Sequence, residues 1–184
     1  MPFLTSLPED AGPPHVFKRY PEIYGPFSDM SQAMMNGPSP LSQAEREIVL
    51  AFAAGVMGCT FVLTGHSEVA YAWGVPRGAL DALLKDIDSA PVDDKLKPLL
   101  AFVRKLAATP NEVCQADVDA VFAAGWDEHA LHDATAVTAR AAFMHRLVAG
   151  HGFAPLDPAV AASHARKRVE HGYVNLYSAF RKPG

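Results

Sequence analysis

The stretch from Glu47 to His66 reads EIVLAFAAGVMGCTFVLTGH. It places one carboxylate, the Cys59 thiol and one imidazole in a segment that is otherwise almost wholly apolar. A buried charge is costly unless it is paired or has a chemical role. If the segment forms two helices that break near Gly58, Cys59 lies in the first turn of the second helix, on one face with Val62 and His66. We therefore predict that Glu47, Cys59 and His66 form a catalytic site.

Helix signals continue on both sides of this stretch. Ser42 and Glu45 form an S-x-x-E capping box, which predicts a helix from Ser42 to about Met57. A second helix is expected from Cys59 to about Trp73, and the two together make a buried hairpin. Helical spacing and breaker residues predict further helices near 22–35, 77–87, 94–107, 116–124 and 127–148. No segment shows sustained alternation of polar and apolar residues, so the predicted fold class is all-α.

The two ends of the chain differ in character from the middle. The first forty residues are rich in proline, which predicts an extended segment with at most one helix, near 22–35, packed on the core as a lid. The main helical domain is expected to span residues 1–155. Residues 156–184 are expected to form an amphipathic helical tail, which either docks on its own subunit or packs across a subunit interface. Its apolar stripe comprises Val169, Tyr173, Leu176, Tyr177 and Phe180.

Composition limits the classes of function. The chain has 184 residues, nearly half of them apolar, and a formal net charge of -4, so neither nucleic acid nor an anionic membrane surface is an expected partner. Cys59 and Cys114 lie far apart and form neither a disulfide framework nor a zinc motif. The uncharged run from Ile48 to Gly65 approaches the length of a membrane span, but its glycines and the preceding capping box favour a buried hairpin. We expect a cytoplasmic protein with no membrane partner.

The spacing of Glu47, Cys59 and His66 resembles the core motif of the AhpD-like alkylhydroperoxidases, within the carboxymuconolactone decarboxylase family. Val62 departs from that motif, because it stands where redox-active members carry their second cysteine. The flanking stretches LSQAEREIVL, KLAATPNEV and DVDAVFAAGW look like the peroxidase-related branch of the family. The resemblance covers residues 17–153 and implies an AhpD-like multi-helix bundle that assembles as a homo-oligomer, a trimer or a hexamer.

The resemblance also implies a chemistry. In AhpD-like enzymes a Glu–His–water relay and paired cysteines reduce a peroxide, and an external dithiol recharges the enzyme. This chain keeps only the first cysteine. We therefore expect first a thiol-dependent, peroxidase-like antioxidant protein that uses Cys59 alone, with His66 and Glu47 as the proton relay. A second reading is non-redox acid–base catalysis on a small cyclic carboxylate, as on the decarboxylase side of the family, with Cys59 only lining the pocket. A third is a non-catalytic oligomeric relative.

Other polar residues are weaker candidates. Arg46 could bind a substrate carboxylate, although a solvated position on the surface is the simpler expectation. His129 and His132 lie one turn apart and Asp133 follows, but no third ligand at a suitable spacing accompanies them, so we expect no metal. The sequence contains no phosphate-binding loop or dinucleotide fingerprint, and we expect no cofactor.

Overall fold

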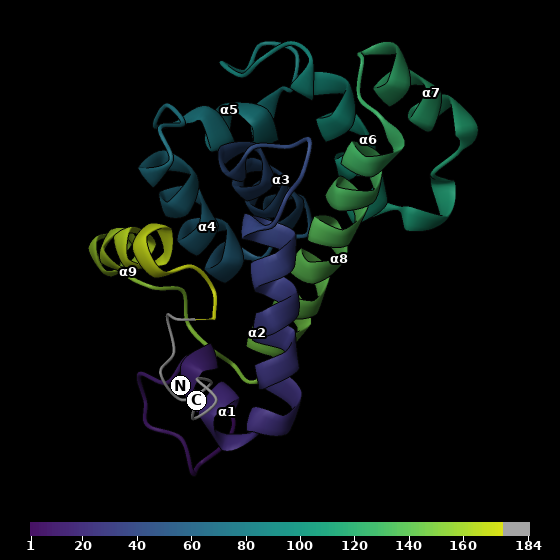
Figure 1. Cartoon of the computed structure of the whole chain (residues 1–184). Coiled ribbons are helices and arrows are strands. Elements are labelled where there is room, and N and C mark those ends of the chain that lie inside the picture. Colours follow the sequence, from purple (N-terminus) through teal and green to yellow (C-terminus); the bar gives the residue numbers. More distant parts are fainter. Residues whose placement is uncertain (175–184) are drawn as a thin grey trace.

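The computed structural model describes residues 1–174 of the chain. Helices account for all the regular structure in this range, which contains no strand (Figure 1). The elements in chain order are α1 (Pro13–Arg19), α2 (Pro21–Asn36), α3 (Gln43–Val56), α4 (Thr60–Ala72), α5 (Ala79–Lys85), α6 (Leu96–Ala108), the 3-10 turn η1 (Pro110–Glu112), α7 (Gln115–Ala123), α8 (Glu128–Gly150) and α9 (Pro158–His171). The predicted all-α fold class is confirmed.

The hairpin of α3 and α4 forms the centre of the fold. Ser42 caps α3 as predicted, since its hydroxyl accepts a hydrogen bond from the Glu45 amide and the Glu45 carboxylate accepts one from the Ser42 amide. Every residue from 46 to 54 is buried, because α3 contacts α2, α4, α5, α6 and α8. An apolar surface on all sides of one helix is typical of such a central position.

Gly58 ends α3 and starts the turn into α4. Its φ angle of 76° lies in the left-handed region, which favours glycine. The amide of Cys59 donates a hydrogen bond to the carbonyl of Ala54, and the amide of Gly58 donates to that of Gly55. This pair of bonds is the Schellman pattern, which satisfies the last carbonyls of a helix. It also moves Cys59 out of the first turn of α4, where we had expected it, to the N-cap position.

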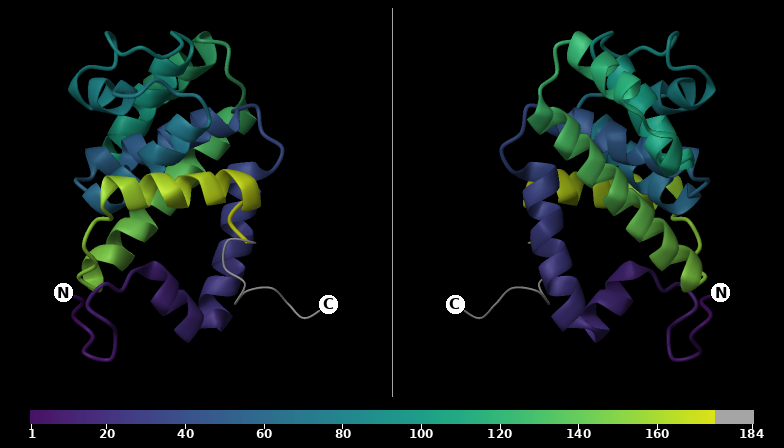
Figure 2. Two further views of the ribbon diagram at one scale, coloured as in Figure 1. Left: turned by 90° about the vertical axis from the view of Figure 1, so that its left-hand side faces the viewer. Right: turned by 90° about the vertical axis from the view of Figure 1, so that its right-hand side faces the viewer.

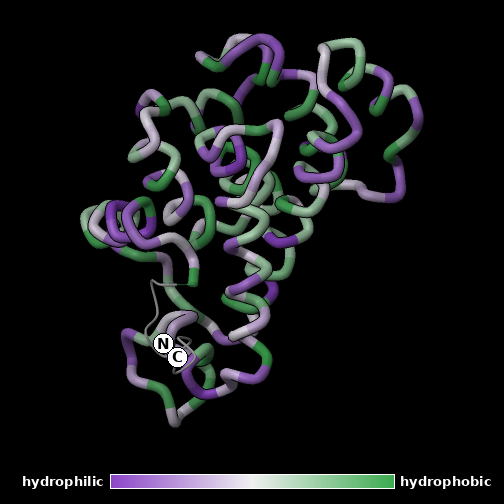
Figure 3. The backbone as a smooth tube through the Cα atoms, viewed as in Figure 1, coloured by the Kyte–Doolittle hydropathy of each residue, from purple (hydrophilic) through white to green (hydrophobic). Residues whose placement is uncertain are grey.

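The remaining core helices surround this hairpin. Long helix α8 begins at Asp127, whose carboxylate caps it as predicted, and it packs on both α3 and α6. Helix α6 starts at Leu96, two residues later than predicted, because the Asp93 carboxylate accepts a hydrogen bond from the amide of Lys95 and holds a turn there. Figure 3 shows hydrophobic residues gathered on the inner helices and hydrophilic residues along much of α9.

The proline-rich N-terminal segment corrects one prediction. It contains two helices where at most one was expected, because Pro13 and Pro21 each stand at a helix start, where the missing amide hydrogen costs nothing. Pro26 lies inside α2, near its first turns. The stacked rings of Phe17 and Tyr24 hold α1 against α2. In Figure 1, α1 lies at the bottom of the molecule and α2 rises from there along α8. Residues of both helices line one wall of a pocket.

The C-terminal helix α9 packs against α4 of the same chain. It ends at Gly172, whose φ of 69° breaks the helix, so Tyr173 does not continue the predicted amphipathic stripe. Tyr173 instead turns inward and is buried. Figure 2 shows α9 crossing between α2 and α8, with α1 below it. Three members of the predicted stripe, Leu176, Tyr177 and Phe180, lie outside the described residues.

Membrane insertion was one reading of the uncharged run in the hairpin. Within residues 1–174, no helix is both long enough and apolar enough to cross a bilayer.

Candidate active site

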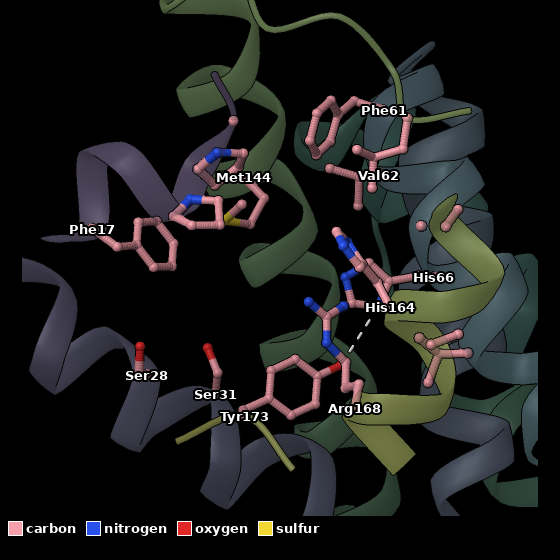
Figure 4. Close-up of a pocket in the computed structure, with 18 of the residues that line it drawn as sticks. Phe17, Ser28, Ser31, Phe61, Val62, His66, Met144, His164, Arg168 and Tyr173 are labelled. Carbon is pink, nitrogen blue, oxygen red and sulfur yellow. Dashed lines mark hydrogen bonds between the residues drawn. The ribbon is translucent and has the colours of Figure 1, made fainter. Parts of the chain in front are cut away.

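A pocket of about 200 Å³ lies between the helical hairpin and the two N-terminal helices. Helices α1 and α2 supply one side, α4 the opposite side, and α8 and α9 the rest. In Figure 4, Phe17, Ser28 and Ser31 face Val62 and His66 across this space. Most of the lining is apolar, with basic groups added from α8 and α9. Its size suits a small ligand.

Glu47 and His66 meet at the wall of this pocket. The Nδ1 atom of His66 lies 2.7 Å from Oε2 of Glu47, and both residues are buried, with 6% and 2% of their surface exposed. His66 lines the pocket and Glu47 stands behind it. Within residues 1–174, Nε2 of His66 has no hydrogen-bond partner, so it is the ring nitrogen left for a ligand. The predicted association of Glu47 with His66 is therefore present.

The burial of this pair sets its protonation state. Burial lowers the pKa of His66 to about 4, and the attraction of Glu47 only partly opposes that effect. Burial also acts to raise the pKa of Glu47, but His66, the Tyr173 hydroxyl and the Arg168 guanidinium outweigh it and lower that pKa. Near pH 7 we therefore assign a neutral imidazole beside a carboxylate. The Nδ1 hydrogen then points to Glu47, and Nε2 is a base.

Tyr173 is the residue of this cluster that the sequence did not identify. Its hydroxyl donates a hydrogen bond of 2.6 Å to Oε1 of Glu47, and it lies 3.5 Å from Nδ1 of His66. The spacing of Tyr173 from Val169 fits a helical stripe and predicted a position on a helix face. The glycine just before it, Gly172, is a helix-stop signal and was the available clue.

Two arginines make the pocket basic, and a histidine lies beside them. Arg140 projects from α8, and its Nε donates a hydrogen bond to the hydroxyl of Ser31. Arg168 and His164 come from successive turns of α9, and Figure 4 shows both near His66. The described lining contains one carboxylate, that of Asp10. Such a surface favours an anionic ligand.

Cys59 lies outside this lining. The residue is 3% exposed and belongs to the hydrophobic core, whereas Val62, one turn further along α4, borders the pocket. Burial raises the pKa of the Cys59 thiol, and the amides of Val62 and Phe61 offset that effect only in part. A raised pKa disfavours the thiolate, which is the reactive form. The structure thus brings together two of the three predicted catalytic residues and places the third in apolar packing.

The weaker candidates have other roles. Arg46 is buried, contrary to the expectation of a solvated position, and its Nη1 donates hydrogen bonds to the carbonyls of Met34 and Gly37 at the end of α2. His129 and His132 both lie beside Asp133 and are exposed. No group of three or more potential metal ligands occurs within residues 1–174.

Solved structures share this fold, and they include two peroxidase-related proteins. The first is an alkylhydroperoxidase AhpD core, an uncharacterized peroxidase-related protein from Ralstonia eutropha JMP134, with a TM-score of 0.73 and 20% identity over 82% of this chain and 78% of that one. The second is an uncharacterized peroxidase-related protein from Silicibacter sp. TM1040, with a TM-score of 0.70 and 23% identity over 77% of this chain and 75% of that one. No protein-family model matches the sequence, and no curated protein matches it. The likeness confirms the predicted AhpD-like fold.

Proposed function

We propose that this chain is a divergent AhpD-like protein that uses His66 and Glu47 for acid–base catalysis on a small carboxylate. One observation carries the proposal: His66 borders the pocket with Glu47 behind it, while Cys59 is packed in the core and Val62 takes the adjacent position at the pocket wall. An enzyme of this kind needs a base at the substrate and no exposed thiol.

The proton transfer follows from the state of the pair. A neutral imidazole with Nε2 toward the pocket removes a proton from a carbon next to a carbonyl group, which leaves an enolate on the substrate. The imidazolium that forms is stabilised by the carboxylate of Glu47, 2.7 Å from Nδ1. The same nitrogen then returns the proton to the enolate, either at the first carbon or at a conjugated one. Atoms and charge balance without an oxidant or a metal.

The basic groups select the substrate class. Arg140 and Arg168 both border the pocket that His66 lines, and their guanidinium groups suit a carboxylate and the negative charge of an enolate. Phe17 and Phe27 add an apolar surface for the body of the ligand, and the Phe27 ring centroid lies 5.6 Å from the guanidinium carbon of Arg140. A compact cyclic carboxylate has both features.

A single-cysteine peroxidase is the second candidate. It is favoured by the two structural neighbours, both described as peroxidase-related. In this reading the Cys59 thiolate attacks the peroxide, the sulfenic acid that forms is reduced by an external thiol, and His66 transfers the proton. The raised pKa of Cys59 and its burial argue against it, because the sulfur would have to become exposed before each turnover.

Two parallel assays on the purified chain distinguish the two functions. The purified chain is incubated in D2O with a five-membered lactone that carries a carboxymethyl group, and deuterium incorporation next to the carbonyl is followed by NMR. Acid–base catalysis predicts exchange above the buffer rate that falls by about 100-fold or more in His66→Gln and persists in Cys59→Ser. In parallel, peroxide consumption with dithiothreitol is measured. Peroxide turnover that Cys59→Ser abolishes, without any lactone exchange, would establish the peroxidase instead.

A further inference from the structure

We propose that Tyr173 is a positioning residue of this site: its hydroxyl fixes the Glu47 carboxylate so that His66 keeps its proton on Nδ1 and offers Nε2 to the pocket. This inference rests on the acid–base function proposed above, in which Nε2 of His66 is the base. Tyr173 is far from the helical hairpin in sequence and lies in the segment that follows α9.

The geometry divides the two carboxylate oxygens between two donors. Oε1 of Glu47 accepts the hydrogen bond from the Tyr173 hydroxyl at 2.6 Å, and Oε2 accepts from Nδ1 of His66 at 2.7 Å. The rings of Tyr173 and His66 are nearly parallel, with an interplanar angle of 8°. A carboxylate held at both oxygens cannot rotate away from the imidazole. The orientation of Glu47 is therefore set by Tyr173 as well as by His66.

The backbone before Tyr173 is built for this position. Gly172 adopts a φ of 69°, which favours glycine, and a Cβ atom there would lie 2.5 Å from Oε1 of Gln32 and would displace that side chain. The same Gln32 oxygen accepts a hydrogen bond of 2.7 Å from the amide of Tyr173. Helix α2 thus anchors the chain two residues after the last residue of α9, His171, which directs the ring inward.

Two guanidinium groups flank the ring itself. The guanidinium carbons of Arg140 and Arg168 each lie 4.9 Å from the ring centroid of Tyr173, within the range of a cation–π contact. The ring is therefore held by side chains from α8 and α9 and by the backbone contact to α2. A side chain that only filled space would not need its hydroxyl directed at a buried carboxylate.

The hydroxyl remains a donor at any physiological pH, because burial raises the pKa of Tyr173 far above its usual value. Without it, Oε1 of Glu47 would be a buried carboxylate oxygen with no donor in this cluster, so the carboxylate would hold a proton more readily. A more basic Glu47 also stabilises the imidazolium form of His66. Removal of the hydroxyl should therefore make His66 easier to protonate. It also leaves the Glu47 carboxylate held at one oxygen and able to rotate, which loosens the choice between the two tautomers of His66.

Other charged groups face His66 and must be considered. Arg140 lies on α8, Arg168 and His164 lie on α9, and His15 and Asp10 reach the pocket from the N-terminal side. The two arginines act to lower the pKa of His66. The Tyr173→Phe substitution changes none of these charges and keeps the aromatic ring, so a change in His66 titration reports on the hydroxyl.

The test follows His66 directly. The chain is labelled with 15N-histidine, the His66 signals are assigned from their absence in His66→Gln, and both ring nitrogens are followed over pH 3.5–8. In the unmodified chain we expect one tautomer, with the proton on Nδ1, and a midpoint near pH 4. In Tyr173→Phe we expect mixed tautomers and a midpoint higher by about one pH unit.

Tyr24→Phe is the matched control, because Tyr24 is also a buried tyrosine, on α2, and makes no contact with Glu47 within the described structure. It should leave the His66 signals unchanged. Unchanged tautomer and midpoint in a folded Tyr173→Phe chain would overturn the proposal. If that chain does not fold, Gln32→Leu, which removes the backbone anchor of Tyr173, decides the question by the same criterion.

The NMR result is independent of turnover. A His66 response to Tyr173→Phe combined with no lactone exchange would refute the proposed catalysis and leave the positioning of Glu47 by Tyr173 intact. Lactone exchange in the unmodified chain, with no His66 response to Tyr173→Phe, would support the proposed catalysis and refute the positioning of Glu47 by Tyr173.

Discussion

Nδ1 of His66 lies 2.7 Å from Oε2 of Glu47, across the break that separates α3 from α4. The hydrogen bond joins the two arms of the central hairpin at the point where the hydrophobic core meets the pocket. The same pair therefore contributes to stability and to the proposed chemistry, and its protonation state links the two.

Stability should fall in mild acid because of His66. Its pKa is about 4 in the folded chain against about 6.5 in the unfolded chain, so the unfolded state binds the proton more tightly. The contribution of neutral His66 to the free energy of unfolding is fully present above pH 6.5. It is lost as the pH falls from 6.5 toward 4, by roughly 3 kcal/mol over the whole window. Urea unfolding at pH 7 and pH 5 measures the loss.

His66→Gln should reduce that difference between pH 7 and pH 5, whatever its effect on absolute stability. His132→Gln is the control, because the His132 side chain is 76% exposed and its removal should leave the acid loss unchanged. If the free energy of unfolding falls equally between pH 7 and pH 5 in His66→Gln and in the unmodified chain, the titrating group is not His66.

The two cysteines should differ sharply in reactivity. Cys114 is exposed at the start of α7, whereas Cys59 is buried and its pKa is raised by that burial. In the native chain a disulfide reagent should therefore label one thiol rapidly and the second at least about 100-fold more slowly. Intact mass after treatment identifies the labelled residue, with Cys114→Ser as the control. In urea both thiols should react alike, and rapid native labelling of Cys59 would support the peroxidase reading.

A thiol at position 62 should introduce redox chemistry. Val62 borders the pocket, and its amide lies against the sulfur of Cys59. In Val62→Cys the new thiol would face a peroxide, and the sulfenic acid that forms would condense with Cys59, three residues away, to give a disulfide and water. Peroxide consumption with dithiothreitol should rise above that of the unmodified chain. The double variant with Cys59→Ser should lose the disulfide, and no gain in Val62→Cys would show that the scaffold does not support thiol peroxidation.

The fold could be predicted because its main signals are local. The capping box at Ser42, the cap at Asp127 and the break at Gly58 each set a helix boundary through residues a few positions apart. The N-terminal segment was less predictable. Its prolines break helices in the interior but fit their first turns, and the sequence alone did not show which position each would occupy.

The candidate site was predictable only in part. Glu47 and His66 could be paired because they flank one turn and share an apolar setting. The contributions of Tyr173 and Arg140 depend on how α8 and α9 fold back on the hairpin, which no local pattern encodes. Cys59 was predicted in the first turn of the second helix, but α4 starts one residue later, at Thr60. The Schellman turn at Gly58 makes Cys59 the N-cap of α4.

Arg46 should matter for stability and not for binding. Its guanidinium is buried and donates to two carbonyls, those of Met34 and Gly37, so it closes the end of α2 against α3. Arg46→Met keeps the apolar stem but leaves both carbonyls without this donor, which should lower the free energy of unfolding by about 2–4 kcal/mol. Arg77→Met is the matched control, because Arg77 forms an ion pair with Glu68 at the surface, where solvent screens it, so its loss should lower the stability far less. Urea unfolding at pH 7 compares the two, and equal small losses would show that the end of α2 is held by its apolar contacts alone.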